Sequence, residues 1–230
     1  MINRSHFVAW LALLAGTAPP VQSSEPAAPE VDIRFTVLAW QRTDQVFHFD
    51  SSGNVSSFEL PTQYRSQEMR YVGDNPLVFF REESGPEGQR FRVPLAKVEV
   101  DPAITKQLLL FVPGGGDDSA EFKVLALDDR LEKFPQRSYR FFNLTDEKIG
   151  VALNDRRVAL ETYDNAIIEL DRGDAMIQLG VYARRGEGFR DVLNSRWPQR
   201  SNERYIIFVI DSPHTQGSLA TKAVPEYFEP

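Results

Sequence analysis

The sequence predicts an all-β protein built from two tandem Ig-like antiparallel β-sandwich units, with one large β-sandwich as the alternative. The first observation is that apolar and polar residues alternate with a period of two from Val31 onwards, which is the pattern of strands with one buried face. The second is that turn-forming residues interrupt this pattern at intervals of about 8–12 residues. The third is that no amphipathic helix of ordinary length stands out, so the crossover helices of a βαβ sheet are missing.

Residues 1–23 predict a secretory signal peptide. Arg4 supplies the positive charge, residues 7–16 form the apolar run, and Val21 and Ser23 are the small residues before the expected cleavage site. An uncleaved membrane anchor is the alternative, but the run is shorter than the roughly 20 residues that a spanning helix needs. No later stretch could span a membrane as a helix, so we expect no integral membrane segment once the signal is removed.

Residues 24–30 are rich in Pro, Ala and Glu and predict an extended linker. The first β-sandwich unit is expected over residues 31–134. Residues 107–112 are apolar almost throughout, which indicates a central strand covered on both faces. The turn formers at 84–88 predict a hairpin. The strands expected in this unit are 33–39, 45–50, 55–60, 68–72, 77–81, 91–93, 97–100, 107–112 and 121–127.

The second unit is expected over residues 135–212, after a polar connector. Seven short strands within one small unit are typical of an Ig-like sandwich. Residues 213–230 show no pattern and are expected to form a flexible tail. The strands expected in this unit are 139–144, 149–153, 157–160, 166–170, 175–183, 189–195 and 204–210.

Three segments of the first unit are echoed in the second. IRFTVLAW and QVFHFD are followed later by YRFFNL and IGVALND, and QLLLFVP is followed by RYIIFVID. The echoes align Phe35 with Phe141 and Phe111 with Phe208, at separations of 106 and 97 positions. Unequal separations imply insertions, mostly around residues 84–100. A true duplication, two unrelated sandwiches and one large sandwich all remain open.

The net charge limits the classes of partner that the protein is expected to bind. The formal net charge is −7, and removal of the leader, which carries one base and no acid, gives −8. A negative surface repels phosphates, so we expect no binding of nucleic acid. The chain has no cysteine, which excludes disulfides, thiolate chemistry and a lipid-anchoring cysteine.

Nucleophilic catalysis is not predicted, and we assign no catalytic residue. A Ser-His-acid site needs a histidine base, and only His48 and His214 lie outside the leader. His48 stands in an alternating strand between Phe47 and Phe49, which indicates a strand residue. There is no G-x-S-x-G elbow.

Acidic pairs are the next candidates. A glycosidase needs two carboxylates held apart across a cleft, and adjacent acids on one loop do not supply this. Asp117 and Asp118 follow three glycines and are weak calcium candidates, because carboxylates and backbone carbonyls are the ligands that calcium prefers. We expect no other metal site and no cofactor.

Aromatic residues are candidates for ligand binding. Trp40, Tyr64 and Trp197 lie near predicted strand ends or loops, where aromatic rings stack on sugars or on protein partners. Packing in the core or at a sheet edge is the alternative for each of them.

The opening of the second unit, YRFFNLT followed by IGVALND, resembles a family of bacterial extracytoplasmic Ig-like domains of unknown function. In that family a first strand ends in an Asn-Leu-Ser/Thr step and a short second strand follows. The matching residues are Phe141, Phe142, Asn143, Leu144 and Thr145. The resemblance covers about a third of the chain and implies a β-sandwich and an exported location.

The length and two-sandwich layout are also similar to those of periplasmic pilus chaperones, and this similarity implies architecture alone. We therefore expect an exported, periplasmic or extracellular module without enzymatic activity. Its partner would be an envelope protein or a polysaccharide, and edge strands would supply the contact by β-addition. The alternatives are a carbohydrate-binding module, a chaperone-like assembly protein and a carboxylate-based hydrolase.

Overall fold

The computed structural model describes residues 30–114, 121–171, 176–185, 188–212, 215 and 218–229. These residues form sixteen strands and one short 3-10 turn, η1 (Pro86–Gly88). The predicted leader and the calcium candidates Asp117 and Asp118 lie outside the described residues. Within the described ranges, no helix has the length and the hydrophobicity required to cross a membrane.

The first unit consists of two four-stranded sheets. The first inner sheet has the strand order β4-β1-β7-β8, and the first outer sheet has the order β3-β2-β5-β6. The strands are β1 (Glu30–Ala39), β2 (Val46–Ser51), β3 (Asn54–Glu59), β4 (Met69–Asp74), β5 (Leu77–Ser84), β6 (Arg90–Val98), β7 (Lys106–Pro113) and β8 (Phe122–Asp128).

The second unit has the same construction. The second inner sheet has the order β12-β9-β15-β16, and the second outer sheet has the order β11-β10-β13-β14. The strands are β9 (Ser138–Asn143), β10 (Ile149–Leu153), β11 (Arg156–Leu160), β12 (Asn165–Glu169), β13 (Met176–Arg185), β14 (Gly188–Pro198), β15 (Glu203–Asp211) and β16 (Leu219–Tyr227).

The expected flexible tail at 213–230 is wrong for most of its described part. Residues 219–227 form β16, which pairs antiparallel with β15 over its whole length, and Leu219 and Val224 are buried. β16 is an edge strand of its sheet, and an edge strand tolerates Pro225 because one side of it makes no ladder hydrogen bonds. The sequence did not predict this strand because the segment has few apolar positions and contains a proline.

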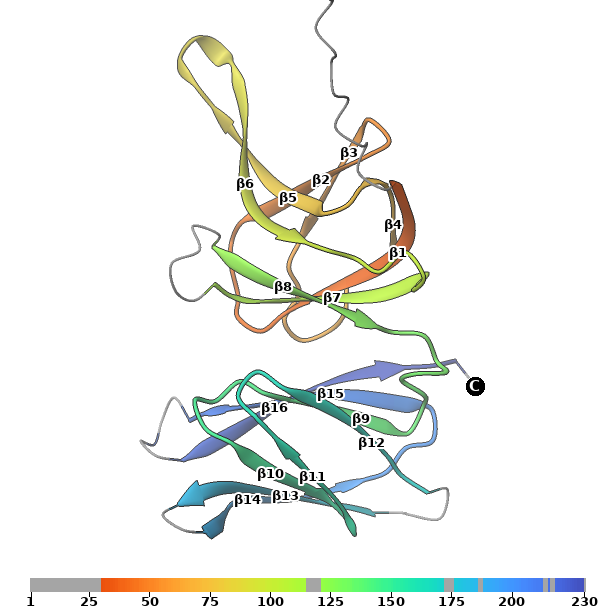
Figure 1. Ribbon diagram of the computed structural model, residues 1–230, viewed down its shortest axis with the longest axis vertical. Helices are drawn as coiled ribbons and strands as arrows, with labels where there is room; N and C mark the ends of the chain where they lie inside the picture. Colours follow the sequence, from red (N-terminus) through yellow and green to blue (C-terminus); the bar gives the residue numbers. More distant parts are fainter. Residues whose placement is uncertain are drawn as a thin grey trace, which may run out of the picture.

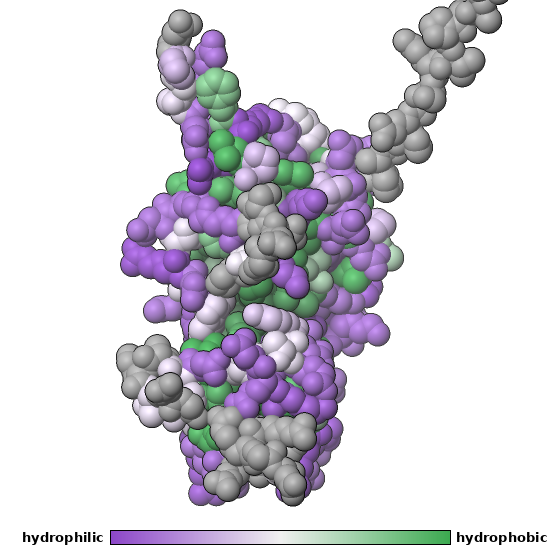
Figure 2. Space-filling view, turned by 60° about the vertical axis from the view of Figure 1, so that its left-hand side comes forward, coloured by the Kyte–Doolittle hydropathy of each residue, from purple (hydrophilic) through white to green (hydrophobic). Residues whose placement is uncertain are grey.

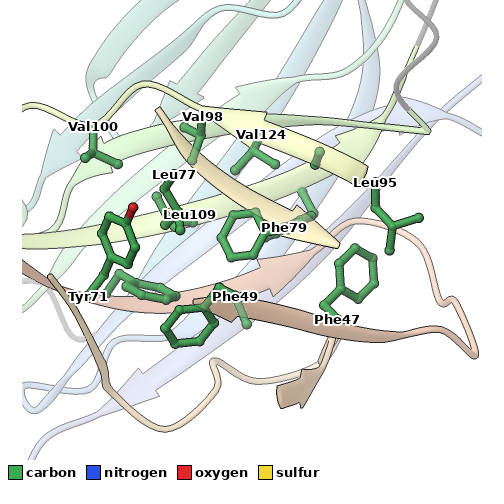
Figure 3. Close-up of a cluster of buried hydrophobic side chains, with 14 of the residues drawn as sticks. Phe47, Phe49, Tyr71, Leu77, Phe79, Leu95, Val98, Val100, Leu109 and Val124 are labelled. Atoms are coloured by element: carbon green, nitrogen blue, oxygen red, sulfur yellow. The ribbon is translucent and has the colours of Figure 1, made fainter. Parts of the chain in front are cut away.

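The four sheets are stacked, with the two inner sheets facing each other and the two outer sheets at the ends (Figure 1). Each unit has its own core between its inner and outer sheet. In the first core, Phe49 packs edge-on against Phe35 and Phe79, with ring centroids 5.3 and 6.3 Å apart, and Figure 3 shows Phe47, Phe49 and Phe79 within this cluster. The prediction of two β-sandwich units is thus confirmed.

One strand pair in each inner sheet differs from the prediction. β1 pairs with β7 in parallel, and β9 pairs with β15 in parallel, so the inner sheets are mixed and not purely antiparallel. Alternation of apolar residues reports which face of a strand is buried. It carries no information on the direction of the neighbouring strand.

The strand order of the first unit recurs in the second, strand for strand. The β-bulges recur as well: the register shifts between Phe79 and Phe80 in the first outer sheet and between Val181 and Tyr182 in the second. The three sequence echoes therefore fall on equivalent strand pairs, β1 and β9, β2 and β10, and β7 and β15. The predicted strands 91–93 and 97–100 are one strand, β6, in which the bulge and an edge position accommodate Pro94.

The residue alignments of two echoes are wrong, by two positions in the first and by one position in the third. The amide of Trp40 donates to the carbonyl of Phe111 at 3.0 Å, and the amide of Leu144 donates to the carbonyl of Val209 at 2.8 Å. Phe111 therefore corresponds to Val209 and not to Phe208. Trp40 likewise corresponds to Leu144, so Phe35 corresponds to Tyr139 and not to Phe141. Phe111 lies in the first core, whereas Phe208 lies in the layer between the units.

A third apolar layer joins the two inner sheets. Its position explains why the central strands β7 and β15 are apolar on both faces, as predicted for residues 107–112. By the equivalences above, Leu110 and Phe208 occupy the same position in the two units, and so do Leu38 and Phe142; all four belong to this layer. The buried members of the layer are Leu38, Leu108, Leu110, Val112, Phe134, Phe142, Ile206, Phe208 and Val224.

The β5–β6 hairpin projects from the first unit (Figure 1 and Figure 2), and the predicted hairpin at 84–88 is confirmed by the pairing of Ser84 with Arg90. Its stem carries exposed ion pairs, including Arg90 with Glu82 at 3.2 Å. Phe91, near the tip, is 47% exposed. The hairpin therefore presents one large apolar side chain among charges.

Candidate functional site

The exposed face of the second outer sheet is hollowed at its centre. Successive side chains of a strand point to opposite faces of the sheet. The exposed face therefore carries the residues that alternate along the strands with the core positions Val151, Leu179 and Val181. The small residues gather on the two central strands, β10 and β13. Two cross-strand rows of the face, from β11 to β14, are Ala159, Gly150, Tyr182, Asp191 and Arg157, Ala152, Gly180, Asn194.

This arrangement leaves a hollow of about 440 Å³. Its floor comes from glycine, alanine and valine, and its walls come from Tyr182 and Arg157. A second hollow of about 310 Å³ lies further along the same face, lined by Gln178, Asn194, Ser195 and Arg196. We call the first one the Tyr182 hollow; its lining residues are Gly150, Val151, Ala152, Arg157, Val158, Ala159 and Tyr182.

Two glycines set the position of the tyrosine ring. A methyl group built on Gly180 would lie 2.8 Å from the phenol oxygen of Tyr182 and 3.0 Å from its Cε2, so the ring lies down against the strand at Gly180. A methyl group built on Gly150 would lie 3.6 Å from Cβ of Tyr182, which is an ordinary contact. The side of the ring that faces Gly150 therefore borders open space.

The equivalent place in the first unit is filled by a histidine. His48 pairs with Phe80, as Gly150 pairs with Tyr182, and the His48 ring stacks on Phe80 with centroids 5.7 Å apart. The guanidinium of Arg92 lies 4.7 Å from the centroid of the same ring, so Phe80 is only 5% exposed. The Tyr182 hollow thus occupies the place that a histidine side chain occupies in the first unit.

Another hollow of about 510 Å³ on the first outer sheet has Asp50 and Asp74 on its lining. Arg92 donates to Oδ2 of Asp50 at 3.1 Å, so this carboxylate belongs to an ion pair. Among the described residues, no group of three or more His, Cys, Asp or Glu side chains is arranged to hold a metal ion.

The three predicted aromatic candidates lie apart. Trp40 contributes to the layer between the units, with its ring centroid 5.4 Å from that of Phe208 and Nζ of Lys222 5.0 Å from its own centroid. Burial lowers the pKa of Lys222, which donates to the Trp40 carbonyl at 3.0 Å. Trp197 packs beside Tyr205 at the edge of the second core. Tyr64 follows β3 and is 67% exposed.

Sequence reasoning missed Tyr182. Its neighbours Val181 and Ala183 face the core, so the strand read as an ordinary buried one. The available signal was the outward parity of Gly150, Ala152 and Gly180, since three small residues in register across two strands leave space beside any aromatic on that face. This signal becomes visible only when the register between β10 and β13 is known.

The Asn-Leu-Thr step of the family resemblance has a structural role. Asn143 is fully buried, and its Nδ2 donates to the carbonyls of Glu147, Leu160 and Glu161 at 2.7, 3.2 and 3.0 Å. Its Oδ1 accepts from the amide and the hydroxyl of Thr145. The two side chains therefore fasten the β9–β10 connection to the end of β11.

A charged junction cluster lies where the connector between the units meets both of them. It consists of Arg65, Asp129, Arg140, Arg204 and Glu226 around the ring of Phe134. Arg204 donates to Oδ2 of Asp129 at 2.9 Å and also contacts Glu226, and Arg65 reaches the same two carboxylates at 2.6 and 2.9 Å. These pairs link the first unit, the connector and the second unit.

Burial dominates the electrostatics of this cluster. It lowers the pKa of Arg140 to about 10, although Asp129 acts in the opposite direction. Burial likewise lowers the pKa of Arg65, again opposed by Asp129 and then Glu226. The guanidinium groups of Arg140 and Arg204 stack on Phe134 at 4.7 and 4.4 Å from its centroid. The cluster serves to hold the units together.

Fold and surface together define a tandem β-sandwich protein with a hollow on the exposed face of its second outer sheet. Comparisons with protein-family models and with curated proteins find no match to this chain.

Proposed function

We propose that this protein is an exported, non-enzymatic module of the bacterial envelope, periplasmic or extracellular, which binds a protein or polymer partner through the exposed face of the second outer sheet. The observation that carries the proposal is the Tyr182 hollow. A ligand site is a concave surface with apolar lining and a few placed polar groups. The hollow has this character, with Gly150 and Ala152 in its floor and Arg157 on its wall.

Two sequence features support the exported location. Residues 1–23 have the three-part pattern of a secretory signal. The Asn143-Leu144-Thr145 step resembles that of extracytoplasmic Ig-like domains, and an Ig-like assignment of both units is part of the proposal.

The ion pairing of the carboxylates that line the hollows favours binding over hydrolysis. General acid–base catalysis on a glycosidic bond needs two available carboxylates. Two hollows among the described residues carry a pair of carboxylates. In the first, lined by Asp50 and Asp74, Asp50 is held by Arg92. In the second, lined by Asp32 and Glu68, Asp32 pairs with Arg70 and Glu68 with Arg34. Among the described residues, those that line the Tyr182 hollow include no carboxylate.

Fractionation of cells that carry the tagged full-length chain tests the location, with recovery in the periplasm or medium expected. Immobilised protein exposed to envelope extract tests binding, with Gly150→His as the variant because it fills the hollow as His48 fills the equivalent place in the first unit. We expect a retained partner that the variant loses. Recovery in the cytoplasm, or equal retention by both proteins, would overturn the proposal.

A further inference from the structure

We infer that the Tyr182 hollow binds an acidic sugar of a polysaccharide, with the sugar ring stacked on Tyr182 and its carboxylate held by Arg157. The inference deepens the proposed function and rests on it, because it names the class of ligand for the same face.

The size and floor of the hollow fit one or two sugar rings. Its volume of about 440 Å³ falls at the low end of the roughly 300–1,000 Å³ typical of small-ligand sites. Gly150 and Ala152 keep the floor low, and the Tyr182 ring lies down against Gly180. The ligand must therefore bring a flat apolar face, such as the C–H face of a pyranose ring, since aromatic rings stack on such faces.

The charge of the face selects an anion. Arg157 lines the hollow and Arg196 lines its neighbour, and within the described residues neither forms an ion pair. By contrast, Arg156, which immediately precedes Arg157 in the chain, pairs with Asp171 at 3.0 Å. The carboxylate of the two rows, Asp191, lies on β14, whereas Arg157 lies on β11 at the other edge of the sheet, and Asp191 accepts from the side-chain amide of Asn194. The two arginines therefore complement a carboxylate of a ligand, which a guanidinium binds through two parallel hydrogen bonds.

A sugar fits this combination better than a peptide does. A uronic acid carries a flat ring and a carboxylate in one rigid unit. An aspartate or glutamate side chain carries the charge without the flat apolar face. The side-chain amide of Gln178 in the neighbouring hollow can donate to a hydroxyl group of the next sugar, which favours a chain over a single monosaccharide.

The test is titration calorimetry of the full chain with a hexamer of galacturonic acid and with a neutral glucose hexamer. We expect the acidic hexamer to bind at least about tenfold more tightly than the neutral one and to weaken with salt. Arg157→Gln and Gly150→His should each weaken it by about tenfold or more. Arg156→Gln is the matched control, because it removes the same charge from the adjacent residue and should leave the affinity unchanged.

Gly150→Ala guards against a folding defect, because its methyl group makes only ordinary contacts; it should weaken binding without changing the thermal unfolding midpoint. Absence of binding by the wild type, or equal binding by Arg157→Gln and Arg156→Gln, overturns the inference. If the acidic hexamer does not bind but envelope extract still yields a partner that Gly150→His loses, the sugar class is wrong and the proposed function stands. If the extract also yields nothing, both are wrong.

Discussion

Arg204 and Asp129 form a buried ion pair in which Nη2 of the arginine lies 2.9 Å from Oδ2 of the aspartate. Arg204 belongs to β15 and Asp129 to the connector, so the pair fixes the connector to the second unit. The first unit joins through Arg65, which reaches the same aspartate oxygen. Removing one member of such a group leaves a buried charge without its partner, which is strongly destabilising.

Asp129→Asn should therefore lower the free energy of unfolding by about 3–5 kcal/mol, measured by urea denaturation. Asp128→Asn is the control, since its pairing with Arg130 at 2.5 Å is partly exposed and is worth about 1 kcal/mol or less. Equal losses in the two variants would contradict a special role for the junction cluster.

Phe208 tests the apolar layer between the units. Phe208→Ala removes ring contacts with Trp40 and Phe142 at 5.4 and 5.7 Å and should cost about 3–5 kcal/mol. Because the layer couples the units, the variant should also separate their unfolding into two steps, visible by calorimetry. Leu131→Ala, at a residue that is 47% exposed, should change stability by less than about 0.5 kcal/mol. A Phe208→Ala protein as stable as Leu131→Ala would exclude this coupling.

Two stacked tyrosines predict a loss of stability in alkali. Burial, reinforced by the Glu203 carboxylate, raises the pKa of Tyr139 to about 12, and burial together with a hydrogen bond to Glu203 raises the pKa of Tyr205. Tyrosine in an unfolded chain ionises near pH 10, so the unfolded state releases these protons first. Stability is then complete below about pH 10 and falls as the pH rises towards 12.

Urea midpoints should fall as the pH rises across this alkaline range. The slope of the unfolding free energy against pH should correspond to the release of up to two protons on unfolding. Tyr205→Phe should reduce the slope, because it removes one of the two ionising groups while it keeps the ring stacked 5.3 Å from Tyr139. A variant whose midpoints fall as steeply as those of the wild type would show that Tyr205 does not contribute.

Asn143→Ala should lower the free energy of unfolding by about 2 kcal/mol or more, because it leaves buried carbonyls and Thr145 without their partner. Asn54→Ala, at an exposed position beside the β2–β3 turn, should stay within about 0.5 kcal/mol. Chemical denaturation of the two variants gives the comparison. Similar stabilities would mean that the Asn-Leu-Thr step is not a structural fastener.

Alternation within a strand was sufficient to predict most of the fold. Phe47 and Phe49 point into the first core as their spacing implies, and the unbroken run over residues 107–112 correctly indicated cover on both faces. The identity of that cover was not predictable, because a sequence shows that a face is apolar and not which distant strand lies on it. The same limit explains the misalignment of Phe111 with Phe208, since two similar runs can be matched one residue out of phase.

The candidate site depended on register to a greater degree. Trp40 and Trp197 were singled out as large aromatics near strand ends, yet both contribute to packing. Tyr182 carried no such signal alone. It borders open space because Gly150 pairs beside it and Gly180 lies beneath its ring, and these relations arise only when β10 and β13 are aligned.

The stacking of the four sheets has a mechanical consequence. Packed sheets are about 10 Å apart, so about 30 Å separates the Tyr182 hollow at one end of the stack from the first outer sheet, whose β5–β6 hairpin projects at the other end (Figure 1). Because the junction is both apolar and ion-paired, the molecule is built as a stiff spacer. A ligand bound in the hollow would therefore lie at a fixed distance of about 30 Å from the sheet that carries the hairpin.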